Sequence, residues 1–131
     1  MTLEHELAAA LAAAPRGAPA VDFDAWSLRV FAHQYEHNPP YRAFCDRRGV
    51  SPRTVAGWED VPAVPTAAFR RLDLACGPAE RTFRTSGTTG GPDARGRHLV
   101  PAVALYDAAA LAAFERFLLP DGFRLPCVFL L

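Results

Sequence analysis

The chain has 131 residues, half of them apolar, and its 14 basic residues balance 14 acidic ones to give a formal net charge of zero. This composition favours one domain with a substantial core, and it argues against nucleic-acid binding, which would need clustered basic residues. No apolar run approaches the roughly 20 residues of a membrane span. The acidic N-terminus also lacks the basic start of a secretory signal. We therefore expect a cytoplasmic protein without a membrane span.

The first half of the sequence is predicted to be helical. Thr2 can cap a helix over 2–14, in which leucines recur every four residues. A Pro/Gly/Ala linker over 15–20 follows. A second helix is expected over 22–37, and a third runs from the cap Asn38 to about residue 48.

The middle of the sequence is rich in proline. Residues 58–69 are expected to form an extended stretch that leads into a short helix at 66–70. A short turn of helix is expected just before this stretch, from Ser51 to about Gly57. Residues 72–76 are expected to form a short strand.

The last third of the sequence begins with a predicted hairpin. A strand over 83–85 leads into a glycine-rich loop, and residues 97–100 form the returning strand. A long helix is then expected over 101–119. The apolar run 125–131 is typical of a buried parallel strand.

The loop of this hairpin has the composition of a phosphate-binding loop. Gly87, Gly90 and Gly91 can adopt positive φ, so successive backbone N–H groups can converge on an anion. Four hydroxyls add short donors for phosphate oxygens or for a bound Mg²⁺ ion, namely those of Thr85, Ser86, Thr88 and Thr89. The loop suits a polyphosphate better than an apolar ligand.

Other loop chemistries fit less well. A Walker loop needs lysine, and all 14 basic residues of this chain are arginine. A dinucleotide fingerprint does not occur, and Ser86 lacks the glycine frame of a nucleophile elbow. A serine hydrolase that uses Ser86 with His98 is therefore the weakest alternative.

The pattern Thr-Ser-Gly-Thr-Thr-Gly-x-Pro resembles the phosphate loop of the adenylate-forming superfamily. With segments 31–41, 61–69 and 96–98 in this order, the chain is similar to the LuxE-type acyl-protein synthetase family from about Trp26 onward. The resemblance implies an α/β fold in which a helical N-terminal half precedes part of an adenylate-forming-type sheet with flanking helices. It also implies ATP and Mg²⁺ as cofactors, a carboxylic (fatty) acid as substrate and a thiol as acyl acceptor.

The resemblance also assigns roles to residues. The phosphate loop would comprise Thr85, Ser86, Gly87, Thr88, Thr89 and Gly90. Many relatives place lysine after the proline of the loop, where this chain has Asp93, and Arg95 or Arg97 could supply the missing charge. His98 is a catalytic candidate near the carboxylate or phosphate, although a structural role is equally compatible with its position. Arg84 is expected to point to the other side of its strand.

The organisation expected from the sequence is a helix and linker over 1–20 and an incomplete ligase domain over 21–131. Because the chain stops in a predicted core strand, we expect a truncated piece that binds ATP weakly and turns over nothing alone. A partner could cover the open sheet edge. The alternative from another class is a non-enzymatic helical interaction module whose glycine loop is only a turn.

Two other sets of residues are expected to be structural. Cys45, Cys76 and Cys127 lack paired spacing, so we expect buried or half-buried thiols and no disulfide or zinc site. His33 and His37 have metal-ligand spacing on one helix, but two partly solvated imidazoles are the simpler interpretation.

Overall fold

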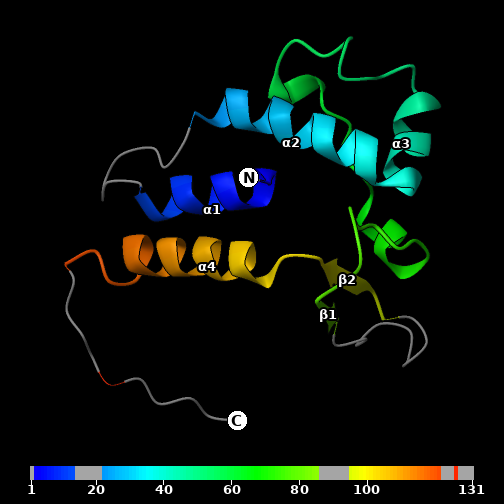
Figure 1. Ribbon diagram of the computed structural model, residues 1–131. Coiled ribbons are helices and arrows are strands. Elements are labelled where there is room, and N and C mark those ends of the chain that lie inside the picture. The colour runs from blue at the N-terminus through cyan, green and yellow to red at the C-terminus, as the bar shows by residue number, and fades with distance from the viewer. Residues whose placement is uncertain (1, 14–21, 86–94, 122–125, 127–131) are drawn as a thin grey trace. The chain divides into compact units, whose positions relative to one another are not determined.

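The computed structural model describes residues 2–13, 22–85, 95–121 and 126. It divides into two compact units, residues 22–103 and the two segments 1–21 and 104–131. The described residues form helices and one small antiparallel sheet (Figure 1). The chain thus has a mixed, mostly helical fold.

Two helices that share Asn38 form the first part of the 22–103 unit. Helix α2 spans Phe23–His37, and its cap Asp22 accepts a hydrogen bond from the backbone N–H of Ala25 at 3.1 Å. Helix α3 spans Pro39–Asp46. The backbone N–H of Asn38 donates to the carbonyl of Gln34, while its side chain caps α3. The predicted second and third helices are therefore confirmed.

The end of α3 follows the sequence prediction closely. Gly49 adopts a φ of 67°, a left-handed conformation in which a side chain would be strained. The backbone N–H of Val50 returns to the carbonyl of Cys45 at 3.1 Å. The helix ends at Asp46, about two residues before the predicted end, and Gly49 closes the turn that follows it.

The core of this unit is small and aromatic. Phe31, Tyr41 and Cys45 are the buried apolar residues in the described part of the chain, with 1%, 5% and 0% of their surface exposed. The rings of Phe31 and Tyr41 meet edge to face with 6.1 Å between centroids. Tyr41 also donates from its hydroxyl to the carbonyl of Pro62 at 2.9 Å, which ties the proline-rich segment to the helices.

The segment after α3 contains two short 3₁₀ helices, η1 at Trp58–Asp60 and η2 at Thr66–Arg70. The second confirms the short helix expected at 66–70. The helical turn expected before Gly57 is only a hydrogen-bonded turn, closed by the backbone N–H of Thr54 and the carbonyl of Ser51.

The prediction of a strand at 72–76 is wrong. This segment is irregular and pairs with no strand in the described part of the chain. Asp73 interrupts its apolar run and binds Arg97, and Leu72 remains 41% exposed. Without a neighbouring ladder, strand propensity alone does not stabilise an extended segment.

The predicted hairpin is confirmed by strands β1 (Arg81–Arg84) and β2 (Arg97–Val100), which pair antiparallel. Arg81 lies opposite Val100, and Arg84 lies opposite Arg97. Within the described ranges these two strands form the whole sheet. The larger adenylate-forming-type sheet therefore stays a prediction.

The other unit contains α1 (Leu3–Ala13) and nearly all of α4 (Val103–Phe117). Both helices were predicted, and α4 is shorter than expected at each end. Its first residue donates a backbone hydrogen bond to the carboxylate of Glu80 at 3.0 Å. The linker 15–20 lies outside the described residues, as do all but one residue of the expected strand 125–131.

No helix in the described part of the chain combines the length and the apolar character that crossing a membrane requires.

The cysteine prediction holds where it can be followed. Cys45 is buried and Cys76 is half-buried, and neither forms a disulfide within the described part of the chain. Burial raises the pKa of the Cys45 thiol above its ordinary value, which makes it a poor nucleophile. Cys127 lies outside the described residues.

Candidate functional site

The base of the hairpin is closed by a pair of hydrogen bonds between Thr85 and Gly96. The backbone N–H of Thr85 donates to the carbonyl of Gly96 at 3.1 Å. In return, the backbone N–H of Gly96 donates to Thr85 Oγ1 at 2.9 Å. The two ends of the loop are therefore held together one residue beyond the strands.

This geometry modifies the role predicted for Thr85. Its Oγ1 already accepts a hydrogen bond, so a phosphate could use only the hydroxyl proton. The other predicted loop residues lie outside the described part of the chain, namely Ser86, Gly87, Thr88, Thr89 and Gly90.

Arg95 and Arg97 differ in their surroundings. Nη2 of Arg97 lies 2.6 Å from Oδ1 of Asp73, in a half-exposed ion pair. Arg95 is exposed, and it has no ion pair with any residue that the structure describes. Of the two, only Arg97 is therefore engaged by a carboxylate that the structure describes.

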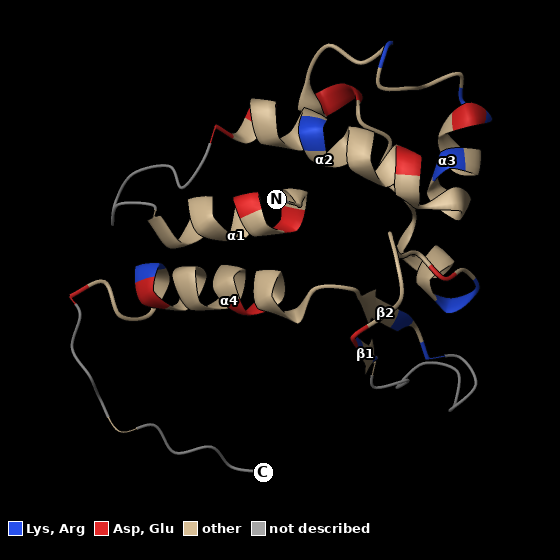
Figure 2. Cartoon of the chain, viewed as in Figure 1, with Lys and Arg blue, Asp and Glu red and all other residues tan. Residues whose placement is uncertain are grey.

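Arg84 is a basic residue of the hairpin that was not among the predicted site residues. Directly opposite residues of an antiparallel pair share a face, so Arg84 lies on the same face as Arg97. The expectation that it points elsewhere was made without the register of the pairing. Like charges in opposite positions repel, and the carboxylate of Asp73 offsets part of this repulsion. Figure 2 shows basic residues in blue in the region of strand β2.

His98 is separated from these arginines by the alternation of the strand. It lies next to Arg97 in β2, so its side chain points to the other face, where it is opposite Phe83. The imidazole stacks on the ring of Phe69, with 4.8 Å between centroids and 30° between planes. This contact gives His98 a packing partner and favours the structural interpretation over the catalytic one.

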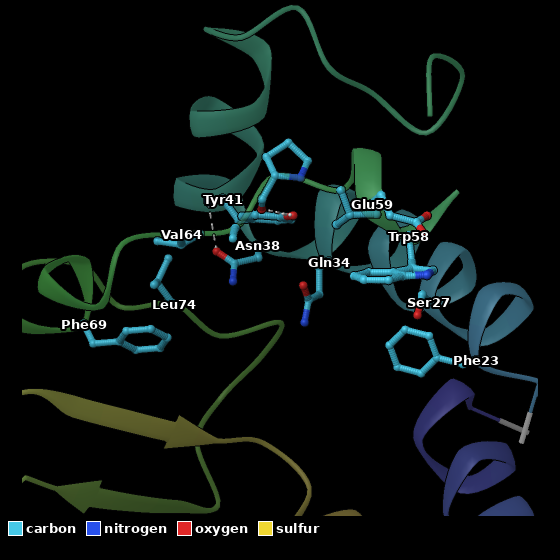
Figure 3. A pocket seen from close by; sticks show the side chains of 13 residues that line it. Phe23, Ser27, Gln34, Asn38, Tyr41, Trp58, Glu59, Val64, Phe69 and Leu74 are labelled. Carbon is cyan, nitrogen blue, oxygen red and sulfur yellow. Dashed lines mark hydrogen bonds between the residues drawn. The ribbon is translucent and has the colours of Figure 1, made fainter. Parts of the chain in front are cut away.

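Two hollows lie in the same unit as the hairpin. One, of about 640 Å³, is lined by aromatic residues and uncharged polar side chains of α2 and the segment that follows α3 (Figure 3). The other, of about 490 Å³, has an apolar wall that includes Phe44 and Leu72. Three arginines also line this second hollow, namely Arg47, Arg70 and Arg71.

The histidine pair on α2 does not gather further ligands. The rings of His33 and His37 lie 4.5 Å apart, tilted by 51°. Within the described ranges, no group of three His, Cys, Asp or Glu side chains comes together.

Comparison of the chain with protein-family models, with curated proteins and with solved structures finds no match. Any functional assignment has to be argued from the residues and the geometry above.

Proposed function

We propose that this chain carries the triphosphate-binding hairpin of an ATP-dependent ligase that activates a carboxylic acid. The observation that carries the proposal is the closed base of the hairpin, where Thr85 and Gly96 bind each other. A loop rich in glycine and hydroxyl residues starts from this base, and three arginines flank it: Arg84, Arg95 and Arg97. Such a combination suits a polyanion because backbone amides, hydroxyls and guanidinium groups all donate to phosphate oxygens.

The proposed reaction needs positioning and charge neutralisation more than acid–base chemistry. A carboxylate oxygen of the substrate attacks the α-phosphorus, and the bond to the bridging oxygen of pyrophosphate breaks. The electron pair leaves with pyrophosphate, which Arg95 and the loop amides would neutralise together with Mg²⁺. In a second step a thiolate attacks the acyl carbon and AMP leaves. Cys45 cannot supply that thiolate, because it is completely buried.

The arginine-lined hollow supports a carboxylic acid as the substrate. Its wall combines apolar side chains with Arg47, Arg70 and Arg71, and no acidic side chain is among the described residues that line it. An acid with an apolar body satisfies both features, because the body replaces water on the wall and the carboxylate pairs with a guanidinium group. Arg70 and Arg71 lie at the end of η2, which contacts β2.

Equilibrium binding of Mg·ATP tests the proposal. Arg95→Gln should weaken binding about tenfold, which is the effect of losing one charge-assisted hydrogen bond. Arg53→Gln is the matched control, because Arg53 is also exposed but lies in the turn after α3. We expect the wild-type chain itself to bind Mg·ATP weakly. The proposal is refuted if Arg95→Gln and Arg53→Gln bind Mg·ATP as well as the wild type.

A second assay addresses the reaction. A complete ligase that contains this chain should release pyrophosphate only when a carboxylic acid is present, and Arg70→Gln should raise the KM for the acid. Pyrophosphate release that does not depend on any acid would contradict the assignment.

One observation favours the non-enzymatic alternative. Helix α4 exposes large apolar side chains three residues apart: Leu111 is 59% exposed, Phe114 40% and Phe117 72%. An exposed apolar stripe of this kind is typical of a helix that docks on another protein. If Leu111→Glu abolishes a protein complex while Mg·ATP never binds, the interaction module is the better assignment.

A further inference from the structure

The aromatic hollow of about 640 Å³ has the composition of a small-molecule site. Sites of this kind usually occupy roughly 300–1,000 Å³ and combine an apolar wall with a few polar groups. Phe23 and Trp58 meet edge to face at one part of the wall, with 5.6 Å between ring centroids. Phe69 forms another part, so aromatic rings stand at both sides of the space (Figure 3).

Asn38 places a hydrogen-bond donor in this wall. Its Oδ1 accepts from the backbone N–H of Tyr41 at 3.2 Å, and because that partner is a donor, the capping atom must be the oxygen. The Nδ2 group is therefore on the other side of the amide, where it points into the hollow (Figure 3). Asn38 is only 6% exposed as a residue, and none of the described residues accepts a hydrogen bond from its Nδ2. This nitrogen is not among the fully buried unpaired atoms, so it is the part of the side chain that remains accessible to solvent.

Two further polar side chains of α2 line the hollow. Gln34 lies one turn before Asn38, and Ser27 lies two turns before Gln34, so all three follow one side of the chain. Within the described ranges, neither Ser27 nor Gln34 makes a side-chain hydrogen bond. The amide of Gln34 offers a donor and an acceptor side by side, and the hydroxyl of Ser27 can serve as either.

The charge in the hollow disfavours anions. Glu59 is the one charged side chain among the described residues that line it, and it is exposed. Its carboxylate repels carboxylates and phosphates, while the buried part of the wall contains only dipoles. A buried charged ligand would therefore lose its hydration without a counter-charge.

From this geometry we propose that the hollow binds a planar, uncharged ring that carries a hydrogen-bond acceptor, such as a carbonyl or a ring nitrogen. The ring packs against Phe23, Trp58 and Phe69, and its acceptor receives the hydrogen bond from Asn38 Nδ2. Aromatic amides and purine nucleosides share this chemistry. The inference does not rest on the ligase function, because it uses only described residues of the segment 23–69 and none of the glycine loop.

The sequence provides a selective readout. Asn38 and Gln34 are the only asparagine and the only glutamine of the chain, and Trp26 and Trp58 are its only tryptophans. A ¹H–¹⁵N spectrum therefore contains two side-chain amide pairs and two indole signals. Trp58 lines the hollow and Trp26 does not, so the second indole is an internal control.

The experiment is a titration of the full chain with nicotinamide and, separately, with adenosine. At least one probe should shift the Asn38 amide pair and the Trp58 indole in a saturable way, and the Trp26 indole should stay in place. Binding of nicotinamide would identify the ligand class as an aromatic amide, and binding of adenosine would identify it as a purine nucleoside. Benzoate, which has a carboxylate on the same ring size, should bind at least about tenfold more weakly than nicotinamide if the amide arm is the one that binds.

Asn38→Asp is the decisive variant. Aspartate caps a helix as well as asparagine does, so α3 is kept, but the Nδ2 donor is lost and binding should weaken by about tenfold or more. Asp22→Asn makes the reverse exchange at the cap of α2, outside the hollow, and should leave binding unchanged. The proposal is overturned if neither probe binds the wild type, if benzoate binds as well as nicotinamide, or if Asn38→Asp binds normally.

Discussion

The substitution Thr85→Val tests how the ends of the glycine loop are held. Valine keeps the branched shape and the strand preference of threonine but has no oxygen. The backbone N–H of Gly96 would then lose its acceptor, which now lies 2.9 Å away in a partly buried position. A net hydrogen bond contributes about 1 kcal/mol, and an unsatisfied buried donor costs about 1–3 kcal/mol. Because this hydrogen bond joins the buried Gly96 to the exposed Thr85 and water can still reach it, we expect a loss of about 1–2 kcal/mol.

Amide hydrogen exchange measures this loss at the site itself. A loss of about 1.4 kcal/mol corresponds to a tenfold change, so the Gly96 amide should exchange roughly ten times faster in Thr85→Val. Thr85→Ser keeps the hydroxyl and should exchange nearly as the wild type does. The amide of Asn38, bound to the carbonyl of Gln34 at 2.9 Å, should be unaffected in both variants. Equal Gly96 exchange in the valine variant and the wild type would refute this description of the hairpin base.

Three further predictions concern the core and the charges. Phe31→Ala should lower the free energy of urea unfolding by about 3–5 kcal/mol, because the ring is 1% exposed and a cavity would replace it; a loss below about 1 kcal/mol would contradict a core centred on Phe31. Burial raises the pKa of Tyr41 above its ordinary value of 10.0, so stability should fall as pH rises above 10.0, where the hydroxyl ionises only in the unfolded chain. Tyr41→Phe should remove this fall in stability above pH 10.0, measured by urea titrations at several pH values, although it also loses the hydrogen bond to Pro62. An unchanged pH profile in the variant would contradict the assignment of this fall to Tyr41. Asp73→Asn should change the free energy of unfolding by less than about 1 kcal/mol, because its ion pair with Arg97 is half-exposed. The same substitution should tighten Mg·ATP binding, because Arg97 is released from Asp73. Weaker binding would contradict a role of Arg97 in binding phosphate.

The helices could be predicted because their ends are encoded locally. Asp22 and Asn38 are acceptors at helix starts, and Gly49 supplies the left-handed residue at a helix end. The hairpin could be predicted for the same reason, since β-branched and aromatic residues flank a glycine-rich turn. These signals depend on residues within one or two turns of each other.

The rest depends on contacts between distant segments. Residues 72–76 have strand composition but no neighbouring strand within the described ranges, and Asp73 is engaged with Arg97 instead. The stacking of His98 on Phe69 likewise joins residues from two elements. Arg84 lies opposite Arg97 because of the register in which the two strands pair, and the sequence did not reveal that register.

The aromatic hollow was also beyond reach of the sequence. Its walls come from α2, η1 and η2, and no spacing rule brings Phe23 next to Trp58. Asn38 was predicted as a helix cap, and that prediction is confirmed. The second role of its amide, as a donor to the hollow, follows only from the direction in which the cap fixes the side chain.

The most direct test of the phosphate-binding hairpin is a ¹H–¹⁵N titration of the chain with Mg·ATP. We expect saturable shifts of the backbone amides of Thr85 and Gly96 and of the glycine amides between them. The dissociation constant for Mg·ATP should be in the millimolar range, which corresponds to a binding free energy on the order of 4 kcal/mol. Gly87→Val should abolish these shifts. Shifts confined to other parts of the chain, or a valine variant that responds like the wild type, would contradict the account.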